Sequence, residues 1–204
     1  MLTAIIVLSI LALGGGAYAL KKTSSPFNVT DGAITAAAGG RWQTSSAEMR
    51  ATLKAQTPQT VTVNFTYLGA TSVVSKLADG EIRHQFGLKL RAQDICNLVY
   101  VMWHFEPTAS RIEILTKQNV GKSTSAQCGD AGYTVIKQIP VPYAQVDVPH
   151  TLHAEMQGTS LTVTADGKPI FSDTLPAFVA GFNGPVGFRS DNAHVVFDYT
   201  VPAQ

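Results

Sequence analysis

The sequence predicts an all-β protein, a two-sheet antiparallel jelly-roll sandwich. Three observations favour this fold. Apolar and polar residues alternate with a period of two in most segments, and no segment carries an apolar helical stripe three turns long. Gly, Pro and Asn separate these segments at intervals of roughly 8–15 residues. About ten to twelve short strands at that spacing are typical of a sandwich that forms a single domain.

The expected strands follow this alternation along the chain. They lie at residues 61–67, 84–91, 111–117, 151–156, 160–164, 169–173 and 194–201. Residues 97–105 are apolar on both faces, which predicts a central strand covered on both sides. Asp166-Gly167 lies between two alternating segments and predicts a hairpin, because both central residues of such a turn take positive φ.

The N-terminal segment, residues 1–20, is interpreted as a signal peptide or membrane anchor. Residues 2–20 carry no charge, and Ala17-Tyr18-Ala19 is a small-x-small site of the kind that signal peptidase cleaves. Two features complicate this interpretation. No Lys or Arg precedes the segment, although a signal peptide usually has one there, and Lys21-Lys22 follow it, which by the positive-inside bias would hold the C-terminal side in the cytoplasm. An uncleaved anchor is therefore the alternative. Residues 21–30 are expected to form a tether, and residues 31–204 the sandwich domain.

The two cysteines, Cys96 and Cys128, help to predict the cellular compartment in which the protein folds. An even number of cysteines behind an export segment favours a disulfide, although two buried thiols in a cytosolic protein are the alternative. The sequence therefore predicts a secreted, periplasmic or membrane-anchored extracytoplasmic protein. It would contact a membrane only through residues 1–20, if these are retained.

The last quarter of the chain carries a recognisable motif. It reads HTLHA at 150–154, LTV at 161–163 before Asp166-Gly167, and GPVGFRSDN at 184–192. This pattern resembles the concanavalin A-like (laminin G and glucanase) superfamily, and in particular its 3-keto-disaccharide hydrolase-like group of exported domains and its lectin-like modules. The resemblance implies a jelly-roll fold and a function related to sugars.

The same motif predicts a structural corner. Gly184 and Gly187 permit a bend or a close backbone approach, and Asp191-Asn192 suit a tight turn before the last strand. Arg189 is assigned with them to fixing this corner.

The candidate binding residues lie in the segment that holds both cysteines. Sugar rings stack their apolar faces on aromatic side chains while amides and charged groups bind the hydroxyls, so a region rich in both is favoured. The candidates are Arg91, Asp94, Asn97, Trp103, His104, Glu113, Lys117 and Asn119.

Several classes of function are disfavoured. A formal charge of +1 without a Lys/Arg stripe excludes a nucleic-acid footprint. The paired-carboxylate glucanase strand and the Gly-x-Ser-x-Gly elbow are both absent from the sequence. Glu113 lies between Arg111 and Lys117, which predicts a lowered pKa, the wrong direction for a general acid. No catalytic residue is assigned. Enzymatic activity is left open, although these observations weigh against it.

No metal or other cofactor is predicted. His150 and His153 are three residues apart on an expected strand and so face opposite sides. Calcium would suit the oxygen donors, but no spacing selects them. The available donors are Asp94, Asn97, Asp191 and Asn192.

The favoured function is a non-catalytic module that binds a carbohydrate or another component of the cell surface. Two alternatives remain: a glycoside-active hydrolase of the same superfamily, and a structural or protein-interaction domain of the cell envelope. The expected partner is a glycan or an envelope component.

Overall fold

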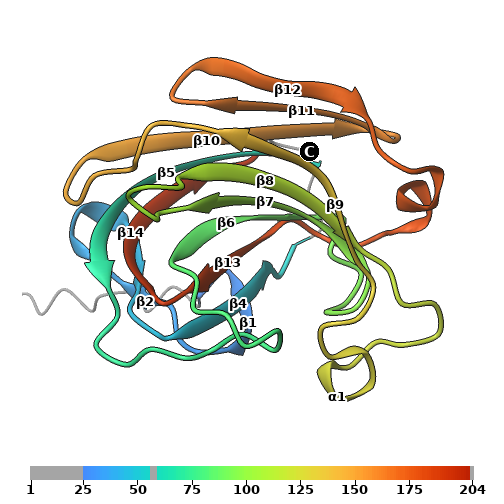
Figure 1. Ribbon diagram of the computed structural model, residues 1–204, viewed down its shortest axis with the longest axis horizontal. Helices are drawn as coiled ribbons and strands as arrows, with labels where there is room; N and C mark the ends of the chain where they lie inside the picture. The colour runs from blue at the N-terminus through green and yellow to red at the C-terminus, as the bar shows by residue number, and fades with distance from the viewer. Residues whose placement is uncertain (1–24, 56–58, 203–204) are drawn as a thin grey trace, which may run out of the picture.

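A computed structural model describes residues 25–55 and 59–202 (Figure 1). The expected signal peptide or anchor therefore lies outside the described residues. The elements are β1 (Phe27–Asp31), β2 (Thr35–Ala36), η1 (Ala38–Gly40), β3 (Trp42–Thr44), β4 (Glu48–Leu53), β5 (Thr60–Ala70), β6 (Gln85–Leu90), β7 (Leu98–His104), β8 (Arg111–Lys117), α1 (Ser125–Cys128), β9 (Tyr133–Pro140), β10 (Pro149–Gln157), β11 (Ser160–Ala165), β12 (Lys168–Thr174), η2 (Ala177–Gly181), β13 (Gly187–Asp191) and β14 (Ala193–Thr200).

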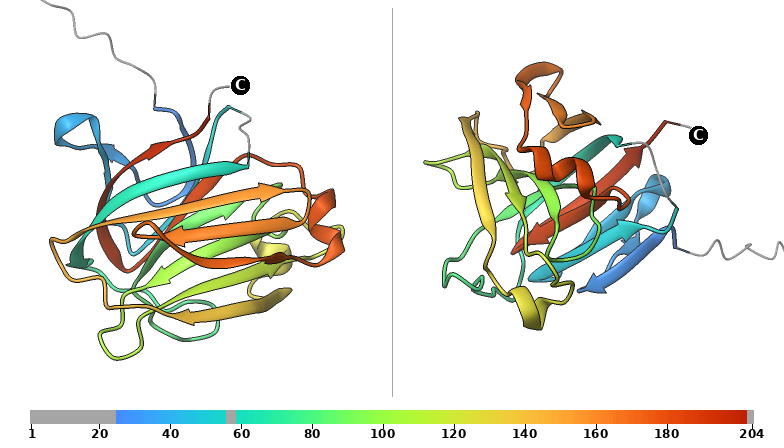
Figure 2. Two further views of the ribbon diagram at one scale, coloured as in Figure 1. Left: turned by 90° about the horizontal axis from the view of Figure 1, so that it is seen from above. Right: turned by 90° about the vertical axis from the view of Figure 1, so that its right-hand side faces the viewer.

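The strands form two seven-stranded antiparallel sheets. Sheet A has the order β1-β4-β13-β6-β7-β8-β9, and sheet B has the order β12-β11-β10-β5-β14-β3-β2. The two sheets lie face to face, with the β11–β12 hairpin and α1 at opposite ends of the molecule (Figures 1 and 2). The predicted two-sheet sandwich is therefore confirmed. Within the residues described, no helix has the length and apolar character needed to cross a membrane.

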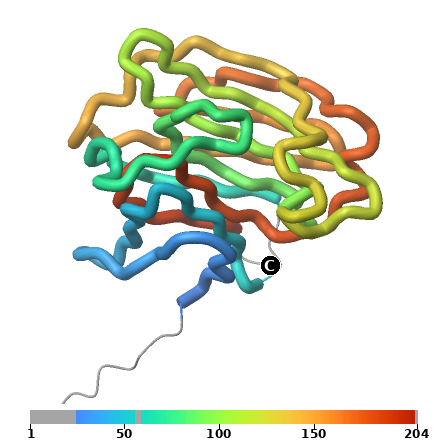
Figure 3. The backbone as a smooth tube through the Cα atoms, turned by 60° about the horizontal axis from the view of Figure 1, so that its bottom comes forward, coloured from blue at the N-terminus to red at the C-terminus, as the bar shows by residue number. Residues whose placement is uncertain are grey.

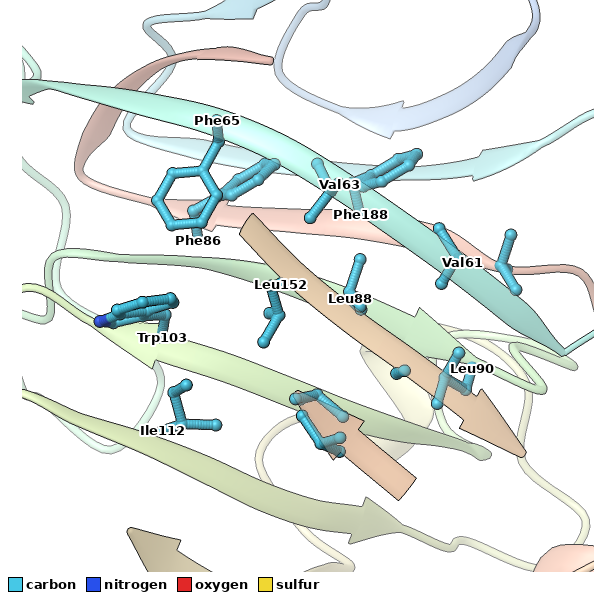
Figure 4. Packing of buried hydrophobic residues seen from close by; sticks show 14 of the residues in the cluster. Val61, Val63, Phe65, Phe86, Leu88, Leu90, Trp103, Ile112, Leu152 and Phe188 are labelled. Atoms are coloured by element: carbon cyan, nitrogen blue, oxygen red, sulfur yellow. The ribbon is translucent and has the colours of Figure 1, made fainter. Parts of the chain in front are cut away.

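The core lies between the two sheets. Because side chains along a strand point alternately to its two faces, one face of each strand points into this core. Val63 and Phe65 from sheet B meet Phe86, Trp103 and Phe188 from sheet A (Figure 4). These side chains are at most 3% exposed. Each such side chain contributes about 1.5–3 kcal/mol when it leaves water.

The expected strands all form, but the sequence missed β1 to β4 and β9. β1 to β3 are short strands separated by turns, and β9 is mostly exposed, so their alternation is weak. β4 (EMRATL) alternates as clearly as the expected strands but was not assigned. The expected tether is partly wrong, because β1 begins at Phe27 and pairs with β4. Residues 27–30 belong to the sandwich.

The central strand β7 is covered on both faces, as predicted, and all seven of its residues are buried. Its inner face joins the main core. Its outer face packs in a second, smaller cluster with neighbours on the same side of sheet A. This cluster consists of Ala92, Leu98, Tyr100, Met102 and Leu115.

The two predicted turns are also present. Asp166 and Gly167 join β11 to β12 with φ of 47° and 73°. Asn192 takes a φ of 50° between β13 and β14, so the chain passes from sheet A to sheet B at the predicted corner. At Gly184 and Gly187 a Cβ would overlap the Ala92 and Ala51 carbonyl oxygens respectively, which confirms close backbone approach.

Gly87 on β6 makes a similar close approach that leads to a testable prediction. A Cβ at this position would overlap the Val101 carbonyl oxygen and the Met102 backbone of β7. We therefore expect Gly87→Ala to destabilise the fold by about 2–3 kcal/mol, as overpacking does, in urea denaturation. Gly181→Ala is the control, because no atom lies within 4 Å of its added Cβ. Equal loss in both variants would show that the backbone contact at Gly87 is not limiting.

Candidate functional site

The outer face of sheet A carries a pocket of about 350 Å³. Two loops flank it: the 71–84 loop, which includes Leu77 and Arg83, and residues 118–132, called here the disulfide loop, which includes Gly129 and Asp130. Both loops lie on the side of sheet A away from sheet B (Figures 1 and 3). The pocket floor therefore consists of side chains that alternate with the core residues of the same strands.

Strand register places five floor positions in one row. Arg50 pairs with Arg189, Arg189 with Gly87, Gly87 with Met102 and Met102 with Glu113, across β4, β13, β6, β7 and β8. Because Gly87 has no side chain, the Arg189 guanidinium can lie over the floor, 5.1 Å from the centroid of the Tyr100 ring. The glycine thus serves both the backbone packing and the shape of the pocket.

A buried carboxylate, Asp191, joins the arginines of this floor. Its Oδ1 accepts a hydrogen bond from Arg50 Nη2 at 2.6 Å, and its Oδ2 accepts from Arg189 Nε at 2.8 Å and from Gln85 Nε2 at 2.6 Å. Burial alone would raise the pKa of Asp191, but Arg189, Arg50 and the Gln85 hydrogen bond outweigh it and hold the pKa below its usual range. Asp191 is therefore ionised and fixes both arginines, a larger role than the predicted corner.

Tyr133 lies at the other end of the pocket, between two cations. Arg189 Nη1 donates to the Tyr133 hydroxyl at 3.3 Å, and Lys117 Nζ lies 4.7 Å from the Tyr133 ring centroid. Lys117 Nζ also donates to the Gly129 carbonyl at 2.6 Å. Burial acts to raise the pKa of Tyr133, but Arg189 and Lys117 lower it by more. The net shift is downward, so positive charge dominates around this hydroxyl.

Glu113 lies at the far end of the row and is held by His104 and Gln138. His104 Nε2 lies 3.3 Å from its Oε2, and Gln138 Nε2 donates to its Oε1 at 2.6 Å. His104 and Gln138 lower the pKa of Glu113 to about 2 against the opposing effect of burial, with a smaller contribution from Arg111. The predicted direction is confirmed, although the main causes are the His104 imidazole and the Gln138 amide rather than two flanking cations. Glu113 is ionised at neutral pH and has no proton to donate.

A disulfide between Cys96 and Cys128 anchors one wall of the pocket, as predicted. Cys96 precedes β7, and Cys128 ends α1 within the disulfide loop. Next to this bond, Ser125, Gly129 and Asp130 line the pocket. The disulfide therefore ties the pocket wall to the central strand.

Three predicted binding residues support this wall instead of lining the pocket. Asn97 Nδ2 donates to Asp94 Oδ1 at 2.9 Å and to the Lys122 carbonyl at 2.8 Å. The Asn119 backbone N–H donates to Asn97 Oδ1, and Asn119 Nδ2 donates to the Ala131 carbonyl, both at 2.9 Å. Asp94, Asn97 and Asn119 thus hold the disulfide loop in place.

Two further predicted residues lie away from the pocket. Trp103 is only 2% exposed and faces the core beside Phe65, because the outward positions of β7 are its even-numbered residues. Arg91 donates to the Phe182 and Gly158 carbonyls, both at 3.0 Å, and so fixes loops beyond the end of β6. Of the predicted set, Glu113 and Lys117 line the pocket, and the fully buried His104 supports Glu113.

Sequence reasoning missed five residues of this site or its immediate surroundings. They are Arg50, Gln85, Lys89, Tyr100 and Tyr133. The available signal was the polar phase of the alternation: Gln85 and Lys89 occupy outward positions of β6, and Arg50 does so in β4. A polar strand face that is simply exposed to solvent shows the same pattern, so only burial distinguishes such a face from the floor of a pocket.

Lys89 follows Gln85 and Gly87 on the outward face of β6, one row beyond Gly87 and outside the pocket lining. It pairs with Gly187 on one side and with Tyr100 on the other. Burial, together with the like charges of Arg50 and Arg189 and against the opposing effect of Asp31, lowers the pKa of Lys89 to about 7.

The oxygen donors considered for calcium do not converge. Asp191 faces two arginines, and the Asn192 amide donates to the Ser75 and Arg83 carbonyls. Among residues 25–55 and 59–202, no three His, Cys, Asp or Glu side chains are grouped so as to hold a metal ion.

Comparison with known proteins supports the fold. No protein-family model matches the sequence, and no curated protein matches it. Among solved structures, the carbohydrate-binding module CBM66 from Bacillus subtilis shares 17% identity, with 85% of this chain and 92% of that chain covered, at a TM-score of 0.62. A galectin-like protein of unknown function from Bacillus subtilis shares 10% identity, with 85% and 86% covered, at 0.56.

The carbohydrate recognition domain of Emp46p is a third similar structure. It shares 11% identity, with 88% of this chain and 89% of that chain covered, at a TM-score of 0.51. At these identities the likeness concerns the fold alone. The chain shares the β-sandwich fold of these structures, in agreement with the fold that the C-terminal motif implied.

Proposed function

We propose that this protein is a non-catalytic carbohydrate-binding module and that the sugar binds in the pocket on sheet A. The observation that carries this proposal is the combination of Tyr100 and Tyr133 with fixed polar groups in one pocket. The two rings lie 6.1 Å apart at 32°, and Arg189 contacts both. A sugar offers an apolar ring face for stacking and hydroxyls for hydrogen bonds, and this pocket supplies partners for both.

The dimensions and the solved structures support the same proposal. Small-molecule sites usually measure about 300–1,000 Å³, a range that includes this pocket. CBM66 and the Emp46p domain, which have the same fold, are carbohydrate-binding by name. The disulfide supports an oxidising compartment outside the cytoplasm, in keeping with export directed by residues 1–20.

The glycoside-hydrolase alternative finds less support in this pocket. Such hydrolysis needs one carboxyl group that is protonated at the working pH. Glu113 is held ionised by His104 and Gln138, and Asp191 by two arginines. We therefore assign both carboxylates to positioning the pocket and not to proton transfer.

Removal of the exposed pocket aromatic tests the proposal. We expect Tyr133→Ala to weaken binding of a glycan about tenfold, because the sugar loses a stacking face and a hydroxyl partner. Glycans are selected on an array, and their affinities are measured by calorimetry. Tyr133→Phe separates loss of the hydroxyl from loss of the ring.

Val120→Ala is the control, since Val120 lies in the disulfide loop that precedes Tyr133, is 86% exposed and lies outside the pocket lining. Its affinity should equal that of the wild type. Absence of binding to every glycan on the array would overturn the proposal and favour the protein-interaction alternative. Unchanged affinity in Tyr133→Ala would exclude this pocket as the site.

A further inference from the structure

The outer face of sheet A buries more positive than negative charge in the pocket floor and in the row beside it. Arg50, Lys89 and Arg189 lie on neighbouring strands and are each at most 7% exposed. Asp191 is the one carboxylate that ion-pairs with this group from a fully buried position, within the described residues. Buried charges without partners are costly, so proteins keep them mainly where function uses them.

The nearby acids at the pocket edge do not balance this charge. Glu48 lies 3.7 Å from Arg50, but its side chain is 44% exposed. Asp31 is also exposed and acts on Lys89 only at a distance. Solvent screens both carboxylates, so their effect on the buried cations is small.

Lys89 has no acceptor of its own. Its ammonium makes no hydrogen bond or ion pair with any residue in the described part of the chain. Its recorded neighbours are charges, of which Arg50 and Arg189 are of like sign. An anionic ligand on this face would give the ammonium the acceptor that the described residues do not supply.

Donors also remain free in the pocket lining. A guanidinium carries five N–H groups, and Arg189 uses one on Nε for Asp191 and one on Nη1 for Tyr133. Its Nη2 group has no acceptor among the described residues. Lys117 donates to Gly129 and retains two further N–H groups. Arg189 and Lys117 meet at Tyr133, where a stacked sugar would place its substituents.

We propose that the pocket selects acidic sugars, whose carboxylate or sulfate ester binds Arg189 and Lys117 beside Tyr133 while Lys89 supplies further positive charge behind them. This inference rests on the proposed function and names the ligand class of the same pocket. The lowered pKa of Tyr133 is in accord with it, since Arg189 and Lys117 favour negative charge at that point. Four other charged groups line the pocket. Asp130 lies in the disulfide loop, Glu113 lies at the far end of the row, and Asp79 is ion-paired with Arg83 in the 71–84 loop.

Matched pairs of oligosaccharides test this inference by calorimetry at fixed pH and salt. One pair is a uronic-acid oligosaccharide and its carboxyl-reduced form; the other is a sulfated oligosaccharide and its desulfated form. We expect at least one acidic form to bind about tenfold or more tightly than its neutral counterpart, because charge-assisted hydrogen bonds are lost on neutralisation. The pair of oligosaccharides with the larger acidic-to-neutral affinity ratio shows whether the pocket prefers a carboxylate or a sulfate ester.

Two lysine variants test whether the preference for acidic sugars comes from the charge of these side chains, with the Tm showing that each variant is still folded. Lys117→Met and Lys89→Met should each reduce the acidic-to-neutral affinity ratio about tenfold, so that each variant weakens binding of the acidic form much more than binding of the neutral form. Lys89→Met should keep or raise the Tm, because it removes an uncompensated buried cation. Lys122→Met is the matched control, since Lys122 is exposed in the disulfide loop and outside the pocket lining.

The outcomes distinguish this inference from the proposed function. Equal affinity for acidic and neutral forms, unaffected by either lysine variant, would overturn the acidic-sugar inference and leave carbohydrate binding intact. Absence of binding to all four oligosaccharides and to the glycan array would overturn both.

Discussion

Asp191→Asn is expected to destabilise the sandwich by about 3–5 kcal/mol, because removing one partner of a buried ion pair leaves the other charges uncompensated. Arg50 and Arg189 both bind this carboxylate, and Lys89 lies beside them. The asparagine amide keeps the size of the side chain but not its charge. Urea denaturation of wild type and variant at pH 7 measures the difference.

The effect should depend on pH in a stated direction. The pKa of Asp191 is lowered from 3.8 in the folded protein, so its contribution is present above about pH 4 and is lost as the pH falls through the folded pKa. The difference between wild type and Asp191→Asn should therefore shrink in acid. A difference that grows as the pH falls would contradict the assigned ionisation.

Two comparisons keep the prediction specific. Asp173→Asn, an exposed carboxylate on β12, should change stability by about 0.5 kcal/mol at most. Combining Asp191→Asn with Arg189→Met should cost less than the sum of the single changes, since the double variant removes both a charge and its partner. A loss below 1 kcal/mol in Asp191→Asn would mean that other groups neutralise the arginines.

Removal of the disulfide has the second large expected effect. In the loop-entropy account, closing 32 residues between Cys96 and Cys128 stabilises the folded protein by about 3–4 kcal/mol. We expect the double variant Cys96→Ala, Cys128→Ala to lose this stability in urea denaturation. Wild type treated with reductant should lose a similar amount without any change of sequence.

Local measurements identify where the bond acts. Amide hydrogen exchange should accelerate first in the disulfide loop, because the bond ties this loop to the start of β7. Glycan affinity should fall as well, since Gly129 and Asp130 line the pocket. If amide exchange instead accelerates equally across the whole sandwich and glycan affinity is unchanged, the disulfide stabilises the chain only globally.

Much of the fold was predictable because its determinants are local. Val63 and Phe65 alternate with polar residues, Asp166-Gly167 forms the hairpin turn, and Gly187 approaches a neighbouring backbone. The disulfide followed from the number of cysteines. The short strands β1 to β3 were missed because alternation over so few residues does not stand out from a loop.

The candidate site was predictable only in part. Glu113 and Lys117 were assigned from their position on a charged strand face, and both line the pocket. Trp103 was assigned from its residue type, but strand phase turns it into the core. An aromatic residue in a strand that is apolar on both faces carries no sequence signal of which face it occupies.

The sequence by itself determined most of the strands, the sandwich class and the corner between β13 and β14, because each depends on patterns among residues close together in the chain. Only the tertiary structure decided the site. Arg50 and Asp191 are 141 positions apart and meet at 2.6 Å because β4 and β13 are neighbours in sheet A. Such contacts depend on strand order and register, and the burial that makes their charges significant exists only once both sheets and loops have assembled.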